Sequence, residues 1–290
     1  MSASRRQLAQ LRPLVPLFVV ATLGVACSAR DTPASLGRTE LTHASREAHD
    51  LAEAASPVAA KPLPETGSSP ATDACPDGMV LASGSYCPEV EQPCEQWMDP
   101  PGTKYAHFRC KKYGPSVCKG ARVPMRFCID RTERREASSE LPAHFVSFDA
   151  ARGLCAKAGA RVCTESEWQF ACEGEAMLPY PYGYERDSKA CNVDTFEGLR
   201  DKQGKLADHR KAVGASPACT SPFGVVDMAG NVEEWVRADG AGKSGWKQVL
   251  KGSYWIPSRH ACRQFQVGHG PEYGGQETGT RCCREVGPPP

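Results

Sequence analysis

The side chains best suited to metal chemistry lie late in the chain, at His260, His269 and Glu272. Imidazole and carboxylate groups are suitable ligands for iron or copper. The alternative is that all three are solvated loop side chains, and we favour this alternative. Three further histidines are isolated in the sequence, and we expect them to be structural or exposed: His107, His144 and His209.

Cysteine is the second chemically useful residue. The chain has 15 cysteines, and setting Cys27 aside leaves an even number (15 − 1 = 14). An even number favours disulfides in an oxidising compartment, and no C-x-x-C occurs, which argues against a zinc site. Spacing alone does not give the pairing. The fourteen are Cys75, Cys87, Cys94, Cys110, Cys118, Cys128, Cys155, Cys163, Cys172, Cys191, Cys219, Cys262, Cys282 and Cys283.

A first short helix is predicted at the start of residues 146–174. Ser147 is a good N-cap, because its hydroxyl can accept a hydrogen bond from a free amide of the first turn. Gly159 is a plausible stop, since glycine takes the left-handed conformation at little cost. The apolar stripe expected between them has the i, i+3, i+4, i+7 spacing of one helix face: Ala151, Leu154, Cys155 and Ala158.

A second short helix follows. Thr164 and Glu167 form a T-x-x-E capping box, in which each side chain satisfies the backbone amide of the other residue. Gly174 closes the helix. Its predicted buried face consists of Trp168, Ala171 and Cys172.

These helices carry a family resemblance. Residues 159–174 read G-x-R-x-x-T-E-x-E-W-x-x-A-C-x-G, which resembles the signature of the sulfatase-modifying-factor family, the formylglycine-generating enzymes and their relatives. Three later stretches resemble that family in the same order: PYPYG at 179–183 its YPWG turn, FGVVDMAGNVEEW at 223–235 its GLYDMxGNVWEW segment, and VLKGSYW at 249–255 its VLRGGSW segment. The resemblance covers roughly residues 76–285. It implies an irregular α+β fold resembling C-type lectins, with little regular secondary structure and many disulfides.

The resemblance also implies two disulfides. Cys155 and Cys172 fall where family members carry structural cysteines, one on each helix. Their implied partners are Cys282, in a GTRC segment that resembles the family's GFRC, and Cys262. The other ten cysteines are expected to pair among themselves, and the adjacent Cys282 and Cys283 require different partners.

Copper(I) in the oxygen-using enzymes of this family is held by two cysteines soon after the GGS segment, as suits a soft ion. Ile256 stands at the first of these positions, and Cys262 best matches the downstream structural cysteine, so the copper pair has no counterpart. Ser253 matches a position near the family's cleft, but a nucleophile needs an adjacent base. The non-heme iron relatives use an H-x-x-x-H-x-E pattern, which this sequence lacks.

Calcium is the cofactor that the resemblance implies. In the GNVWEW segment the family binds it through backbone carbonyls and side chains that correspond to Gly230, Asn231, Val232 and Glu234, and oxygen ligands suit this ion. The alternative for Asn231 is a turn residue in the left-handed conformation. A second family site corresponds to Asn192 and Val193, with a later aspartate from among Asp194, Asp201 and Asp208.

The N-terminal part is predicted to be an export signal followed by a tether. Arg5, Arg6 and Arg12 precede an apolar run at residues 14–25 whose length suits a signal peptide. Residues 23–27, LGVAC, resemble a bacterial lipobox, which predicts lipid on Cys27; simple secretion is the alternative. Residues 28–74 have hardly any large apolar side chains and are predicted to be a disordered tether. His43 and His49 within it are expected to be inert.

The folded domain is predicted at residues 75–287, with strands at 78–82, 125–130, 232–236 and 248–250. Residues 83–124 read as a cysteine-rich insertion and residues 176–222 as turns. The net charge of +1 has no long run of one sign, so no nucleic-acid partner is expected. We therefore predict a lipid-anchored envelope protein that binds a protein, peptide or glycan without catalysis. The competing hypothesis is a metal-dependent oxidoreductase with a site around His260 and His269.

Overall fold

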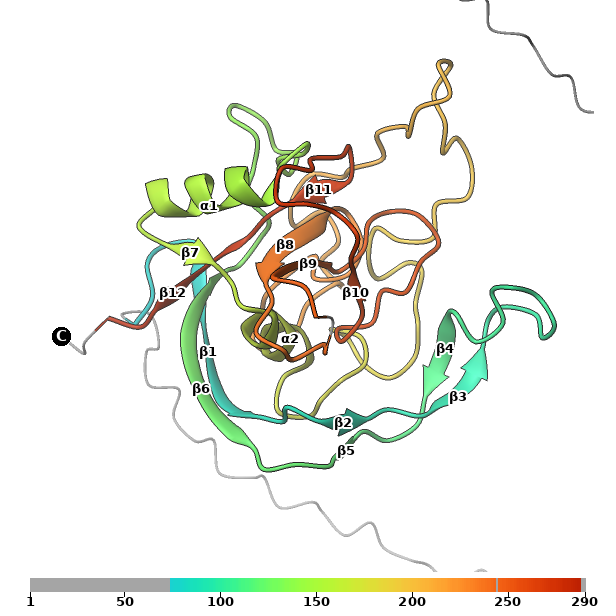
Figure 1. Cartoon of the computed structure of the whole chain (residues 1–290), viewed down its shortest axis with the longest axis horizontal. Helices are drawn as coiled ribbons and strands as arrows, with labels where there is room; N and C mark the ends of the chain where they lie inside the picture. Colours follow the sequence, from blue (N-terminus) through green and yellow to red (C-terminus); the bar gives the residue numbers. More distant parts are fainter. Residues whose placement is uncertain (1–73, 244, 288–290) are drawn as a thin grey trace, which may run out of the picture. The chain divides into compact units, whose positions relative to one another are not determined.

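The computed structural model describes residues 74–243 and 245–287 (Figure 1). The predicted export signal, Cys27 and nearly all of the predicted tether at 28–74 lie outside the described residues. In the described part of the chain, neither helix has the length and apolar character needed to cross a membrane.

The larger sheet has the strand order β1-β6-β12-β7. Its longest pair is antiparallel and runs in register from Met79 opposite Asp130 to Tyr86 opposite Val123. The strands predicted at 78–82 and 125–130 are confirmed, and both are longer than predicted. The four strands are β1 (Met79–Tyr86), β6 (Val123–Asp130), β12 (Cys282–Glu285) and β7 (Arg161–Val162).

A second sheet, in the order β10-β9-β8-β11, supports the later motifs. β8 pairs antiparallel with β9 and parallel with β11. Apart from Arg237, every residue of β8 and β9 is buried, and the short strands predicted at 232–236 and 248–250 are confirmed. The strands are β10 (Phe265–Gln266), β9 (Gln248–Lys251), β8 (Glu233–Arg237) and β11 (Thr278–Gly279).

Two helices, α1 (Phe148–Lys157) and α2 (Glu165–Glu173), confirm the predicted pair. Ser147 caps α1, and the reciprocal capping box of Thr164 and Glu167 opens α2. The stripe predicted for α1 is half wrong: Ala151 and Cys155 are buried, but Leu154 is 40% exposed and Ala158 is exposed as well. The helix therefore buries a narrower face than its apolar spacing indicates.

α2 lies against the curved β1–β6 pair, as Figure 1 shows. Its Trp168 and Phe170 are fully buried and pack with Phe127 and Ile129 of β6 in the main core. A smaller core joins α1 to the second sheet through Ala151, Cys155 and Trp235. The two helices thus link the two sheets.

The predicted insertion consists of two consecutive two-stranded ribbons that extend the β1–β6 hairpin (Figure 1). The inner ribbon pairs β2 (Val90–Glu91) with β5 (Val117–Cys118), and the outer one pairs β3 (Cys94–Trp97) with β4 (Cys110–Tyr113). Each ribbon has one disulfide beside it, Cys87–Cys118 and Cys94–Cys110. Among the described residues, no helix or strand lies between α2 and β8, in agreement with the turns predicted there.

All fourteen cysteines that follow Cys27 are paired. Cys155 joins Cys282 and Cys172 joins Cys262, which are the two pairs that the resemblance implies. Cys283 takes a different partner from its neighbour, as expected. The other bonds are Cys75–Cys128, Cys163–Cys283 and Cys191–Cys219, beside the two of the insertion. The protein is thus an irregular, disulfide-rich α+β fold.

Candidate functional site

The segment 252–262 follows β9 and contains the positions where the motifs place the copper thiols. Ser253 has a φ of 58°, a conformation that costs a residue with a Cβ roughly 1–3 kcal/mol and is often found at functional sites. Its side chain is buried, and within the described residues its hydroxyl has no hydrogen-bond partner. No base contacts the hydroxyl, so the structure gives Ser253 no means of acting as a nucleophile.

Neither Ile256 nor Cys262 can hold copper(I). Ile256 is half-buried and has no donor atom. Cys262 is fully buried, and its sulfur is bonded to Cys172 of α2. A thiolate is the ligand that copper(I) requires, and a disulfide sulfur does not supply one.

His260 belongs to a chain of buried polar contacts and not to a metal site. Its Nδ1 accepts a hydrogen bond from Arg186 Nη2 at 2.7 Å, and its Nε2 donates to the Tyr254 carbonyl at 2.8 Å. Burial, together with the adjacent Arg186 charge, lowers the pKa of His260 to about 4, so the ring is neutral at physiological pH. Both ring nitrogens are therefore already used.

The same chain of contacts reaches the insertion. Arg186 forms a two-point ion pair with Asp194, at 2.8 and 2.7 Å, and Arg109 Nη1 lies 3.7 Å from the same carboxylate. Arg109 in turn holds Asp99 through both Nε and Nη2. The outer ribbon is thereby fixed to the segment that contains His260.

His269 and Glu272, the other predicted ligands, are not brought to His260. The ring of His269 stacks on Tyr273, with the centroids 3.8 Å apart. In the described part of the chain, no three His, Cys, Asp or Glu side chains lie so that they alone could hold a metal ion. The described residues therefore do not assemble the metal cluster that was weighed for these three side chains. The favoured interpretation, three solvated loop side chains, is wrong for His260, which is only 2% exposed.

The two predicted calcium segments do come together. Asn192 forms a parallel bridge with Gly230, where a side chain would meet the Asn192 carbonyl oxygen. Asn192 Nδ2 donates to Asn231 Oδ1 at 2.9 Å, and Asn231 Nδ2 donates to Glu133 Oε2 at 2.8 Å. Asn231 also has a φ of 59°, the left-handed conformation given above as its alternative explanation.

The Glu234 carboxylate already has hydrogen-bond partners within the protein. Its carboxylate accepts hydrogen bonds at 2.6 Å from Arg281 Nε, Arg281 Nη2 and Trp168 Nε1. The candidate aspartates are also engaged: Asp194 with Arg186, Asp208 with Arg210, and Asp201 with backbone amides of its own turn. As placed, these carboxylates already have partners within the protein. Calcium binding by Gly230, Asn231, Val232 and Glu234, and by Asn192 and Val193, stays a prediction.

Arg281 and Glu133 are central residues that the motifs did not indicate. Arg281 is fully buried and also donates to the Asp130 and Val226 carbonyls at 3.1 Å. Burial and the nearby charges of Asp227 and Glu234 raise the pKa of Glu133 well above its usual value. The GTRC segment contains Arg281 next to Cys282, but the resemblance implied a role only for the cysteine.

A narrow recess of about 20 Å³ lies at Ser253. Phe108, from the loop between β3 and β4, lines it together with Arg259, whose guanidinium lies 5.2 Å from the Phe108 ring centre. Met98 and Tyr105 of this loop and Trp97 just before it are exposed, and the exposed Phe196 ring lies 5.9 Å from Arg109 at the end of the loop; the four residues are between 38% and 65% exposed. We call these four residues the aromatic face.

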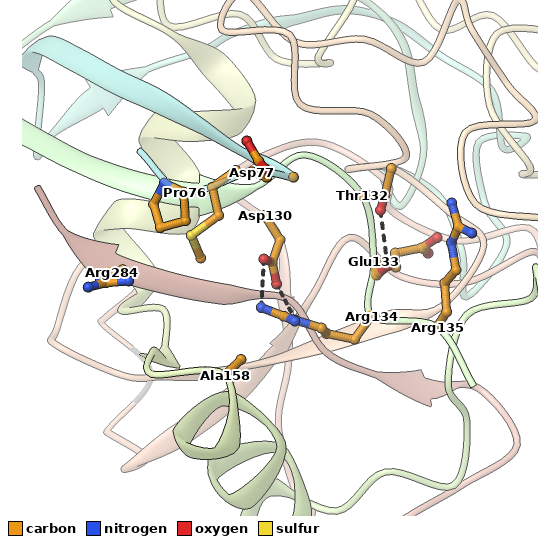
Figure 2. A pocket seen from close by; sticks show the side chains of 11 residues that line it. Pro76, Asp77, Asp130, Thr132, Glu133, Arg134, Arg135, Ala158 and Arg284 are labelled. Atoms are coloured by element: carbon orange, nitrogen blue, oxygen red, sulfur yellow. Dashed lines mark hydrogen bonds and ion pairs between the residues drawn. The ribbon is translucent and has the colours of Figure 1, made fainter. Parts of the chain in front are cut away.

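A larger hollow of about 520 Å³ lies at the other end of the main sheet, beside the start of β1 (Figure 2). Asp130 and Arg134 face each other there in a two-point ion pair at 2.6 and 2.8 Å. Arg135, on its rim, is paired with the exposed Glu140 at 2.9 Å. Asp130, Arg134 and Arg135 of this hollow are thus paired within the protein.

Comparisons with known proteins agree with the motifs. A family model described as a sulfatase-modifying factor enzyme 1-like domain matches residues 95–286. The inactive C-alpha-formylglycine-generating enzyme 2 of Bos taurus is 32% identical over 162 residues, which cover 52% of this chain and 52% of that protein. The formylglycine-generating enzyme of Mycobacterium tuberculosis is 29% identical over 195 residues, covering 63% of this chain and 56% of its own. The chain spans about half the length of these curated relatives.

Among solved structures, that of PvdO from Pseudomonas aeruginosa is similar to this chain. It shares 20% sequence identity with a TM-score of 0.48, covering 72% of this chain and 94% of that one.

Proposed function

This chain belongs to the sulfatase-modifying factor enzyme 1-like family, and from that premise we propose that it is a non-catalytic member that binds a ligand at the bacterial cell envelope. The observation that carries the proposal is the chemistry of the segment 252–262. Ile256 occupies one copper position, and Cys262 is consumed by a disulfide to Cys172. The Bos taurus relative is named as an inactive enzyme, which also supports a non-catalytic role.

The aromatic face is the surface that we propose for the ligand. Trp97, Tyr105 and Phe196 expose between 40% and 65% of their surface, and exposed apolar side chains that gather in one patch mark interaction sites. Arg109 lies 5.9 Å from the Phe196 ring centre, which adds a cationic group beside an aromatic ring. Such a surface suits a glycan or a peptide from the envelope.

The catalytic part of the proposal is tested with a cysteine-containing peptide substrate of the formylglycine-generating enzymes. We expect no aldehyde product by mass spectrometry, with or without added copper, while the Mycobacterium tuberculosis enzyme gives product under the same conditions. Formation of formylglycine by this chain would refute the proposal. Stoichiometric iron or copper that is lost in His260→Ala would instead support the competing oxidoreductase hypothesis.

The binding part is tested with isolated bacterial cell-wall sacculi and with a defined glycan array. We expect retention of the wild-type domain and at least tenfold weaker retention of a Trp97→Ala/Tyr105→Ala variant. Leu154→Ala, which removes an exposed apolar side chain on α1, is the matched control. Equal retention of all three proteins would remove the aromatic face from the proposal.

Anchoring through lipid on Cys27 is also part of the proposal, since residues 23–27 resemble a lipobox. The expected result is a protein in the membrane fraction that moves to the soluble fraction in Cys27→Ser.

Structural calcium, the remaining prediction, is measured by calcium analysis of the purified protein. We expect Asn231→Ala to lower the calcium content.

A further inference from the structure

Lys251, the last residue of β9, and Glu165, the first residue of α2, bring an amine and a carboxyl group together inside the domain. Both side chains are fully buried, and Lys251 Nζ lies 3.8 Å from Glu165 Oε1. Within the described residues, neither Nζ nor either carboxyl oxygen has a hydrogen-bond partner. A buried ion pair offsets its loss of hydration only when hydrogen bonds support it, and this pair has none.

Apolar rings and backbone enclose the two groups. Lys251 Nζ lies 5.4 Å from the ring centre of Trp168 and 5.9 Å from that of Phe265. Next to the carboxyl group, a Cβ atom at Gly242 would collide with Glu165 Oε1, so the backbone of Gly242 covers that oxygen. Solvent therefore does not reach either group, and the low local polarity disfavours their charged forms.

The two other acids of α2 have the hydrogen bonds that Glu165 lacks. Arg161 Nη2 pairs with Glu167 at 2.6 Å. Arg263 Nη2 pairs with Glu173 at 2.5 Å. Glu165 alone of the three faces a lysine, and it does so without a hydrogen bond. Its partner can therefore leave the charged state, which an arginine cannot do.

The family motif shows the same contrast at this position. VLRGGSW has arginine where this chain has Lys251. Arginine stays protonated in proteins, whereas a buried lysine loses its proton readily and then acts as a nucleophile. Burial lowers the pKa of Lys251 to about 8, so the neutral amine is more accessible in the folded protein than in the unfolded chain.

We propose that Lys251 and Glu165 react to form an amide bond between their side chains, which joins β9 covalently to α2. Folding first brings the groups together as an ion pair, and transfer of one proton from Nζ to the carboxylate gives a neutral amine and a neutral acid. Nζ then forms a bond to Cδ of Glu165, the bond from Cδ to the hydroxyl oxygen breaks, and the hydroxyl leaves with a second amine proton as water. Nothing is oxidised or reduced.

The geometry and the product both favour this reaction. The 3.8 Å between Nζ and Oε1 is slightly longer than the roughly 3–3.5 Å of a near-attack arrangement, and the fold holds both groups in place. The amide is neutral, so it removes two charges from surroundings that disfavour them. In water the same acid and amine persist as separate ions, because hydration stabilises both charges.

Mass spectrometry of the folded, purified protein tests the proposal. After incubation at physiological temperature, all disulfides are reduced and alkylated. We then expect the wild type to be lighter than Lys251→Arg by one water molecule, once the substitution itself is corrected for. Trypsin should release residues 162–186 and 248–259 as a single branched peptide that is uncleaved at Lys251. Unlinked peptides, or a water loss located at any other residue, would overturn the proposal.

Lys251→Arg is the matched control, because it restores the motif residue, keeps the positive charge and supplies no neutral amine. In reducing, denaturing gel electrophoresis the wild type should migrate faster than Lys251→Arg, since the bond keeps residues 165–251 as a closed loop. Lys247→Arg makes the same change at a nearby exposed lysine and should behave as wild type in both measurements. Equal migration of the wild type and Lys251→Arg would also contradict the proposed bond.

Discussion

Burial determines the charge of Glu233. Loss of hydration, followed by repulsion from Glu277, raises its pKa from 4.5 to about 8. The folded state therefore holds this proton more tightly than the unfolded chain does. By linkage, the resulting stability is present in full below about pH 4.5 and is lost as the pH rises through about 8.

This linkage gives a testable prediction. The free energy of unfolding of the wild type should fall between pH 6 and pH 8 by up to about 1.4 kcal/mol per pH unit more than that of Glu233→Gln. Burial raises the pKa of Tyr254 and Tyr273, so both phenols stay neutral over this range. Urea unfolding at several pH values measures the difference. Parallel stability curves for the two proteins would contradict it.

Single residues also show what the sequence allowed us to predict. Ile256 and Cys262 could be interpreted because they stand at fixed positions within a motif. His260 could not, because its partner Arg186 is 74 residues away and no motif connects them. Glu233 was overlooked for a similar reason: a departure from a motif becomes informative only when the burial of that position is known.

At the scale of elements, α2 and β9 are joined by an ion pair with poor geometry. Lys251 and Glu165 are both fully buried, and Lys251 Nζ lies 3.8 Å from Glu165 Oε1. Within the described residues, none of the three charged atoms has a hydrogen-bond partner. Burial lowers the pKa of Lys251 to about 8. The motif has arginine here, whose longer fork can reach a carboxylate at two points.

A double-mutant cycle tests how this pair contributes. Lys251→Met alone should destabilise the protein by about 3 kcal/mol, since it leaves a buried carboxylate unpaired. Lys251→Met combined with Glu165→Gln should recover most of that loss, because no buried charge remains. Denaturant unfolding of the wild type, both single variants and the double variant gives the coupling energy. Simple additivity of the two single effects would show that the two charges do not interact.

The elements differ in how well local sequence predicts them. Both helices were located correctly because their caps are local: Ser147, Thr164 and Glu167 contact residues within one turn. The prediction that Leu154 is buried was wrong, because the spacing of apolar residues indicates which face of a helix is buried but not how wide that face is. The two-residue strands β7, β10 and β11 were not predicted, since pairing with distant chain segments defines them.

At the scale of the whole molecule, three disulfides tie the C-terminal stretch to the helices. They span 127, 120 and 90 residues, for Cys155–Cys282, Cys163–Cys283 and Cys172–Cys262 respectively. Two of them hold β12, which lies between β6 and β7 in the larger sheet. The C-terminal stretch is thus joined covalently to residues 155–172, in the middle of the chain.

The chain-entropy model predicts how much unfolding free energy the protein loses when one of these disulfides is removed. The Cys172→Ala/Cys262→Ala variant should lose about 4–5 kcal/mol of unfolding free energy on the chain-entropy model for a loop of this length. The Cys94→Ala/Cys110→Ala variant, which opens a span of only 16 residues, should lose about 3 kcal/mol. Denaturant unfolding compares them, and a larger loss for the shorter loop would contradict this ranking.

The complete pairing of these fourteen cysteines makes folding depend on the compartment. With little regular secondary structure to hold the sheets, the domain needs its long disulfides, and these persist only under oxidising conditions. We expect residues 75–287 produced in an oxidising compartment to resist limited proteolysis and to show no free thiol. The same domain produced in a reducing cytoplasm should be degraded rapidly and should expose reactive thiols. Equal protease resistance of a fully reduced domain would mean that packing alone maintains the fold, and it would remove the main physical argument for the export that we propose.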